Sequence, residues 1–145
     1  MASYQFQFIN GPIPESTILQ LLEHAQNNNT GAQSLFIGRI RADEVEDTVV
    51  TAIEYSAYED LAYREAEKIM HELGEKYALH YLIMYHSLGK VAINQISVVI
   101  ITSSTHRSQA ISACNEAINM IKQRLPIWGL DITRHGQVLW KINTL

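Results

Sequence analysis

Ile96-Ser-Val-Val-Ile-Ile-Thr-Ser-Ser-Thr-His-Arg107 runs from a strand of mostly β-branched residues directly into the start of a helix. Its first six residues are apolar apart from one serine, which is typical of a strand that is buried on both faces and central in its sheet. A helix at about residues 106–124 is predicted next, because alanine, cysteine and isoleucine recur at helical spacing until Pro126 ends the pattern. The rest of the chain is organised around this strand–helix junction.

Segments on either side of the junction predict further strands and helices. We expect strands at about residues 4–9, 32–41, 49–55, 79–86 and 96–101, helices at about 14–25, 62–77 and 106–124, and a closing hairpin at about 127–133 and 138–142. Consecutive strands with interspersed helices favour an α+β domain with a mixed, largely antiparallel sheet and three helices, rather than a doubly wound sheet. At 145 residues, the chain is expected to form a single domain that spans residues 1–145.

Glycine and polar residues between these segments give finer expectations. Strands 32–41 and 49–55 are expected to pair as a hairpin with a long acidic tip, and Ser87-Leu-Gly-Lys90 is expected to turn the chain. Gly38, inside a strand, indicates a bulge or a close approach of two backbones. The run Asn27-Asn-Asn-Thr-Gly31 is interpreted as a polar turn that requires no chemistry.

The composition argues against several classes of protein. The net charge is −4, from 11 lysine and arginine residues against 15 aspartate and glutamate residues, so a basic face for nucleic acid is not expected. Apolar runs fall far short of the roughly 20 residues that a membrane span needs, and the first residues lack the pattern of a signal peptide. The single cysteine, Cys114, fits a reducing compartment and is expected to be a buried, inert thiol. We therefore predict a cytoplasmic protein that binds neither nucleic acid nor a membrane.

Residues 104–107 form the first candidate site. A strand end followed by a Ser/Thr cap leaves backbone N–H groups at a helix N-terminus, where the helix dipole favours an anion. Arg107 adds a guanidinium suited to bidentate contact with phosphate, and His106 stands beside it. The alternative is an ordinary helix cap followed by a histidine and an arginine on the surface.

Other cations form two further candidates. Lys122 projects about 20° from Ile111 on a helical wheel, so its stem can lie on the core with the amine in a cleft, or it can simply extend into solvent. In a cleft, a lysine can act as acid, base or nucleophile. Strand alternation places Arg39 and Arg41 on one face, either as an anion clamp or as an edge pair that points into water. The six histidines lack zinc-ligand spacing, so no metal site is expected.

Together these segments resemble the large, catalytic subunit of molybdopterin synthase. The matching blocks are Gly31-Ala-x-x-x-Phe36-x-Gly38-x-x-Arg41, Glu54-Tyr55-x-Ala57-Tyr58, His86-x-x-Gly89, Ser97-Val-Val-x-x-x-Ser103-Ser-x-His106-Arg107 and Lys122-x-x-x-Pro126-Ile-Trp128. The blocks occur in the family's order and cover residues 31–128. Each block is weak alone, whereas the ordered set is quite specific.

The resemblance implies an α/β hammerhead fold of the large-subunit type and a homodimer within a heterotetramer. The partner it implies is a small ubiquitin-like sulfur carrier, whose C-terminal Gly-Gly thiocarboxylate enters a pocket on the large subunit. Two sulfur transfers would convert cyclic pyranopterin monophosphate into molybdopterin, in molybdenum cofactor biosynthesis, with no cofactor implied for the subunit itself. His106, Arg107 and Arg41 match the substrate-binding pocket, with Arg41 contributed across the dimer, and Lys122 matches the catalytic lysine beside the tail.

One departure from the family pattern separates two hypotheses about activity. After Pro126-Ile-Trp128 the family usually has a second functional lysine, where this chain has Gly129. Candidates to supply the missing cation are Arg124, Arg134 and Lys141. The first hypothesis is an active sulfurtransferase, and the alternative is a catalytically impaired paralogue that binds the ubiquitin-like tail. A third hypothesis is a phosphate-ligand sensor that uses only His106 and Arg107.

Overall fold

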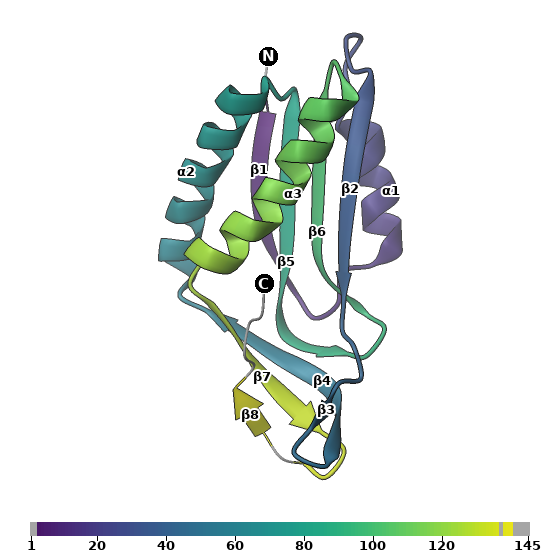
Figure 1. Ribbon diagram of the computed structural model, residues 1–145, viewed down its shortest axis with the longest axis vertical. Helices are drawn as coiled ribbons and strands as arrows, with labels where there is room; N and C mark the ends of the chain where they lie inside the picture. The colour runs from purple at the N-terminus through teal and green to yellow at the C-terminus, as the bar shows by residue number, and fades with distance from the viewer. Residues whose placement is uncertain (1–2, 137, 141–145) are drawn as a thin grey trace.

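A computed structural model of the chain describes residues 3–136 and 138–140 (Figure 1). Its strands are β1 (Ser3–Asn10), β2 (Ala32–Arg39), β3 (Glu44–Val45), β4 (Thr48–Ala57), β5 (Tyr81–Ala92), β6 (Ile96–Ser104), β7 (Ile127–Thr133) and β8 (Val138–Trp140). Its helices are α1 (Glu15–His24), α2 (Glu59–Tyr77) and α3 (Arg107–Arg124). Every expected helix and strand has a counterpart, although Lys141 and Ile142 of the expected closing hairpin lie outside the described residues. No helix in the described part combines the length and the apolar character that a membrane crossing requires.

The strands lie in the order β2-β6-β5-β4-β7-β8, with β1 beside β5 and β3 beside β4. Among the described pairings, β1 and β5 run parallel and the others run antiparallel. This topology confirms the α+β class with a mixed, largely antiparallel sheet. β6 lies between β2 and β5, and each of its residues is buried, which confirms it as a central strand.

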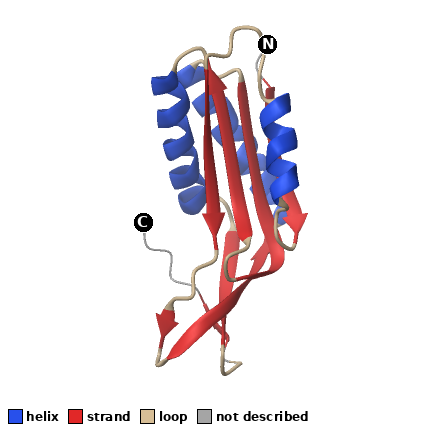
Figure 2. Cartoon of the chain, turned by 90° about the vertical axis from the view of Figure 1, so that its right-hand side faces the viewer, coloured by secondary structure: helices blue, strands red, loops and turns tan. Residues whose placement is uncertain are grey.

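Helices cover both faces of the sheet that is formed by β1, β2, β6 and the first part of β5. α1 packs on one face, and α2 and α3 pack on the other (Figure 2). Val98 and Ile100 of β6 belong to the cluster under α2 and α3, whereas Val99 and Ile101 belong to the cluster under α1. Both faces of β6 must therefore be apolar, which explains its continuous run of apolar residues. We call this the helix-covered sheet.

The strands at the lower end of Figure 1 form a second sheet with no helix over it. β4 pairs with the second part of β5 on one side and with β7 on the other, and β7 pairs with β8. Its apolar cluster comprises Ile40, Val50, Ile53 and Val91. β5 runs through both sheets and fixes their relative position. We call this second sheet the hairpin sheet.

The expected hairpin between residues 32–41 and 49–55 is wrong. β2 pairs with β6, from Ala32 opposite Ser104 to Gly38 opposite Val98, and Phe36 packs against the cluster under α3. β4 instead pairs with β5, β7 and the two-residue β3. Alternation shows that a segment is a strand but not which strand it pairs with, because that choice depends on contacts distant in sequence.

The expected turn at Ser87-Leu-Gly-Lys90 is also wrong. β5 continues through these residues to Ala92, and the turn before β6 contains Asn94, with φ of +70°. Gly89 has φ of +79° and lies where β5 stops pairing with β6 and starts pairing with β4. A glycine adopts this left-handed conformation without a steric cost, so here it redirects a strand rather than ending one.

Candidate functional site

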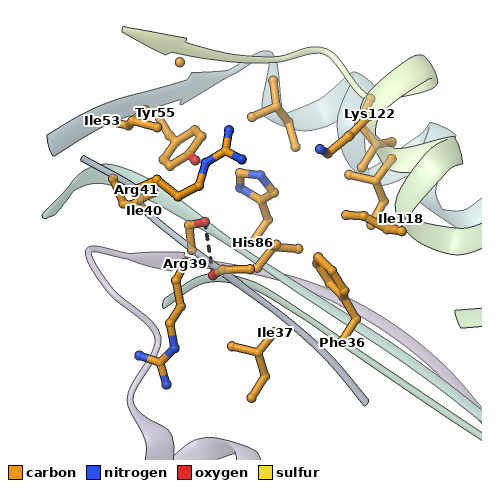
Figure 3. Close-up of a pocket in the computed structure, with 17 residues that line it drawn as sticks. Phe36, Ile37, Arg39, Ile40, Arg41, Ile53, Tyr55, His86, Ile118 and Lys122 are labelled. Atoms are coloured by element: carbon orange, nitrogen blue, oxygen red, sulfur yellow. Dashed lines mark hydrogen bonds between the residues drawn. The ribbon is translucent and has the colours of Figure 1, made fainter. Parts of the chain in front are cut away.

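A cavity of about 420 Å³ lies where the two sheets meet the last turns of α3 (Figure 3). It is lined by Phe36, Ile37, Gly38, Arg39, Ile40, Arg41, Ile53, Tyr55, His86, Ser97, Val98, Ile118, Ile121, Lys122, Leu125, Ile127 and Gly129. The pairing of β2 with β6 shifts register between Gly38 and Arg39, and a Cβ at Gly38 would lie 2.4 Å from Val98 Cγ1. The expected irregularity at Gly38 is confirmed, and the residue that the register shift skips is Ser97 of β6.

Lys122 and Arg41 both line the cavity. Lys122 belongs to the last turn of α3, and Figure 3 shows its amine directed toward the centre of the cavity. The Arg41 guanidinium approaches from the other side in the same view, and it lies 3.3 Å from Asp43, with side chains 77% and 42% exposed. An exposed ion pair of this kind contributes roughly 0–1 kcal/mol. Arg41 can therefore exchange Asp43 for an anionic ligand.

Arg39 and Arg41 both line the cavity, but their guanidinium groups do not lie together. One Arg39 nitrogen donates to the Asn94 carbonyl oxygen at 2.7 Å, and another lies 3.3 Å from Glu15. Figure 3 shows the two guanidinium groups pointing in different directions. Both side chains are nevertheless exposed and Ile40 between them is buried, so the predicted alternation holds and only the head groups diverge.

His86 is a cavity residue whose chemistry the sequence analysis missed. The side chain is buried, and its Nδ1 lies 2.8 Å from the Ser87 carbonyl oxygen. A carbonyl can only accept, so Nδ1 carries the proton and Nε2 is left as an acceptor. In Figure 3 the ring stands between the head groups of Arg41 and Lys122. Burial lowers the pKa of His86 from 6.5 to about 4, against the opposing effect of the Ser87 bond, so the imidazole is neutral at pH 7.

Tyr55 forms the wall of the cavity next to His86. The two rings meet edge to face, with centroids 5.0 Å apart and an interplanar angle of 90°. Burial raises the pKa of Tyr55, although a hydrogen bond with Ser97 acts in the opposite direction. The phenol therefore stays uncharged at neutral pH. Uncharged aromatic walls beside two cations suit a ligand that combines a planar ring with an anionic group.

The three cations considered as replacements for the missing lysine are placed as follows. Arg124 lies 2.9 Å from Glu72 and 3.3 Å from Glu65, on the side of α3 that faces α2. Arg134 follows the end of β7 and does not line the cavity. Lys141 lies outside the described residues. Neither of the two described candidates therefore supplies a cation to the cavity.

Gly129 lies on β7 opposite Tyr55 and lines the cavity directly. A longer side chain at this position would therefore stand beside the space that Lys122 and Arg41 approach. Within the described part of the chain, these two residues supply the cationic head groups that point into the cavity. The position at which the family pattern has a second lysine is thus part of the site, and the chain leaves it without a side chain.

His106 and Arg107 lie at the far end of α3 from the cavity. His106 is the N-cap residue and makes no capping side-chain hydrogen bond, while the Ser104 hydroxyl donates to the His106 carbonyl oxygen at 2.6 Å. The prediction of a serine or threonine N-cap for α3 is therefore wrong. Both side chains are exposed. Within one chain, Arg41 and Lys122 therefore lie together at the cavity, whereas His106 and Arg107 lie at the other end of α3.

The described residues contain no group of three or more histidine, cysteine, aspartate or glutamate side chains placed to hold a metal ion. Cys114 is buried in α3, as expected, with its sulfur 3.9 Å from the Ile100 carbonyl oxygen. Burial raises the pKa of this thiol, and a protonated thiol is a poor nucleophile. Cys114 is also not among the residues that line the cavity.

Known proteins resemble this chain in both sequence and structure. A family model described as MoaE protein matches residues 11–124. The chain belongs to the MoaE family. The molybdopterin synthase catalytic subunit of Drosophila erecta is 38% identical over 139 residues, which cover 94% of this chain and 37% of that protein. The solved structure of molybdopterin synthase from Staphylococcus aureus matches with a TM-score of 0.84 and 29% identity, over 95% of this chain and 97% of that one.

A second solved structure of the family contains two kinds of subunit. It is a protein–protein complex of subunits 1 and 2 of molybdopterin-converting factor from Helicobacter pylori, which matches with a TM-score of 0.78 and 26% identity, over 93% of this chain and 88% of that chain. These neighbours confirm the MoaE-type fold expected from the ordered motifs. The chain spans less than two fifths of the length of the Drosophila relative. The MoaE match includes Arg41, His86 and Lys122 but ends before Gly129.

Proposed function

We propose that this chain is the catalytic subunit of a molybdopterin synthase and transfers sulfur to cyclic pyranopterin monophosphate. The observation that carries the proposal is the approach of Lys122 and Arg41 to one cavity in a chain of the MoaE family. The names of its relatives support the same activity. The reaction belongs to molybdenum cofactor biosynthesis, and the proposal includes a cytoplasmic location.

The residues of the cavity suit an anionic substrate and an acyl sulfur donor. The donor would be the C-terminal Gly-Gly thiocarboxylate of a small ubiquitin-like subunit, whose extended tail enters the cavity. The Lys122 ammonium can stabilise charge on the carbonyl oxygen of that tail and can exchange protons as each thiocarboxylate is consumed. Arg41 offers the bidentate contact that a phosphate group favours. Two transfers would supply the two sulfur atoms of the dithiolene.

A second copy of the chain would complete the phosphate end of the site. His106 and Arg107 cannot serve the cavity of their own chain, because they lie at the other end of α3. In a homodimer they would join Arg41 of the second copy. This arrangement agrees with the expectation that Arg41 acts across the dimer from His106 and Arg107, and it gives each active site residues from both chains.

The small partner subunit has support from the Helicobacter pylori neighbour, which is a complex of two different subunits. The sulfur-carrier chemistry of that partner is part of our proposal. One small subunit bound near each cavity of the homodimer would produce the heterotetramer. In this proposal the tail enters between the hairpin sheet and the end of α3, which form walls of the cavity together with β2 and β6.

Reconstitution tests the proposal directly. The purified chain is mixed with its thiocarboxylated small subunit and cyclic pyranopterin monophosphate, and dithiolene is measured by mass spectrometry. The control uses the same small subunit with an ordinary C-terminal carboxylate, which has no sulfur to give. Dithiolene that depends on the thiocarboxylate supports the sulfurtransferase.

Two other outcomes of the reconstitution would replace the proposal. Binding of the small subunit without turnover would favour the impaired paralogue, for which Gly129 is the specific observation. Phosphate binding without any affinity for a ubiquitin-like subunit would favour the sensor.

A further inference from the structure

The polar turn between α1 and β2 carries hydrogen bonds that continue to the start of α3. The Thr30 hydroxyl donates to Asn27 Oδ1 at 3.3 Å and accepts the Asn27 backbone N–H at 3.1 Å. His80, just before β5, places Nδ1 3.0 Å from the same Thr30 hydroxyl. Its Nε2 lies 3.3 Å from the Thr105 hydroxyl, at the junction of β6 and α3. The His80 ring therefore links two segments that are far apart in sequence.

The donors and acceptors in this network define the direction of each hydrogen bond. A hydroxyl has one proton to donate. Thr30 gives its proton to Asn27, so it must accept the Nδ1–H of His80. In the tautomer with its proton on Nδ1, the ring accepts through Nε2, and the Thr105 hydroxyl donates to it. Phenylalanine can fill the same space but can make neither bond, whereas the amide of glutamine has both a donor group and an acceptor group.

Backbone contacts bring the same segments together. The Gly31 N–H donates to the Ser104 carbonyl oxygen at 3.0 Å, and the His80 N–H donates to the Ser103 carbonyl oxygen at 2.8 Å. A Cβ at Gly31 would lie 2.2 Å from the Thr105 carbonyl oxygen, so a glycine is required for this close approach. The turn at residues 27–31, which was interpreted as requiring no chemistry, therefore packs against the residues that precede the candidate anion site.

We propose that His80 is a positioning residue, which holds Thr105 and thereby sets the direction in which His106 and Arg107 leave β6. The inference rests on the proposed function, in which this pair binds the substrate phosphate. Thr105 and the two residues after it are exposed, so the surrounding core does not fix their side chains. The hydrogen bond from the Ser104 hydroxyl to the His106 carbonyl oxygen lies within the β6–α3 junction itself. The His80 ring instead connects this junction to the turn at Thr30.

The test compares steady-state kinetics of the reconstituted enzyme across matched variants. His80→Phe and Thr105→Val each remove the ring-to-hydroxyl bond with little change of shape, and we expect each to raise the KM for cyclic pyranopterin monophosphate about three- to tenfold. The kcat should stay within about twofold, because Lys122 lies at the other end of α3. The double variant should be no worse than either single variant, and His80→Gln should recover part of the loss.

The control is His24→Phe, at an exposed histidine whose ring contact with Tyr81 a phenylalanine can keep. This variant should keep the wild-type KM. Unchanged KM in Thr105→Val would overturn the role of His80, and so would additive effects in the double variant. If His80→Phe does not fold, the KM of Thr105→Val alone tests the positioning role of His80. Arg107→Ala separates the two proposals: an unchanged KM in that variant removes the phosphate role of Arg107 itself, whatever His80 does.

Discussion

Arg107 and Lys122 stand at the two ends of α3, fifteen positions apart (122 minus 107) and therefore about 22 Å apart along the helix axis. Lys122 lines the cavity together with Arg41, and Arg107 does not. An active site that uses both residues must therefore take them from two copies of the chain. Two individually defective chains can then complement each other.

Mixed dimers of Arg107→Ala and Lys122→Ala should recover activity. The arginine variant alone should bind substrate more weakly by about 1.5–3 kcal/mol, the contribution of a hydrogen bond to a charged group. A mixed dimer contains one site with both mutations and one with neither, so refolding the two variants together should restore a part of the wild-type turnover. Separately refolded variants, mixed at the time of the assay, are the control. Equal activity in both preparations would mean that no active site combines Arg107 of one chain with Lys122 of the other.

Lys122→Ala should reduce turnover about 10²–10³-fold, the usual effect of removing one group that stabilises a developing oxyanion. Binding of the small subunit should change far less, because the lysine is one residue among the many that line the cavity. Single-turnover formation of dithiolene measures the chemical step. Lys68→Ala, at an exposed lysine of α2 with only an i,i+3 ion pair, is the control and should keep the wild-type rate. Full activity in Lys122→Ala would remove this residue from the mechanism.

His86 should make the stability of the protein depend on pH. Its pKa is about 4 in the fold and 6.5 in the unfolded chain, so below pH 6.5 the unfolded state binds a proton that the folded state does not. The contribution to stability is complete above pH 6.5 and is lost as the pH falls toward 4. It amounts to about 3 kcal/mol, at 1.36 kcal/mol for each unit of difference.

Urea unfolding of wild type and His86→Phe at pH 7 and pH 4 measures this contribution of His86. Phenylalanine keeps the edge contact with Tyr55 but cannot take up a proton, so the variant should lose about 3 kcal/mol less than wild type between these values. Exposed carboxylates change the free energy of unfolding equally in both proteins, so their effect cancels when the two losses are compared. Equal losses of unfolding free energy in wild type and His86→Phe would mean that the buried imidazole is already charged in the folded protein at pH 4.

Local sequence predicted those features of the fold that depend on neighbouring residues. The helical spacing of alanine, cysteine and isoleucine correctly predicted α3, whose buried residues include Ala110, Ala113, Ala117 and Ile121. The apolar run of β6 identified a central strand. Strand pairing was not predictable in this way. Residues 32–41 and 49–55 have the alternation of hairpin partners, yet β2 is held against β6 by packing that involves α3.

The candidate site was predictable in its charged residues but not in its arrangement. Lys122 and Arg41 were both identified, and the structure brings them to one cavity. His86 was overlooked because its burial arises only when β5 lies between β6 and β4. The block that begins at this histidine and ends at Gly89 was the signal that could have indicated it.

Gly129→Lys should raise turnover about tenfold or more. The position lies on β7 opposite Tyr55 and lines the cavity, so a lysine there would add a cation near Lys122, and neither Arg124 nor Arg134 now supplies one. A tenfold gain corresponds to about 1.4 kcal/mol of transition-state stabilisation, which is modest for a cation in a partly enclosed site. Gly129→Gln fills similar space without charge and should give no gain, so the pair separates charge from bulk. Initial rates of dithiolene formation provide the measurement. Equal rates in wild type and Gly129→Lys would mean that the cavity needs no cation at this position, and the glycine would then be a neutral departure from the family pattern.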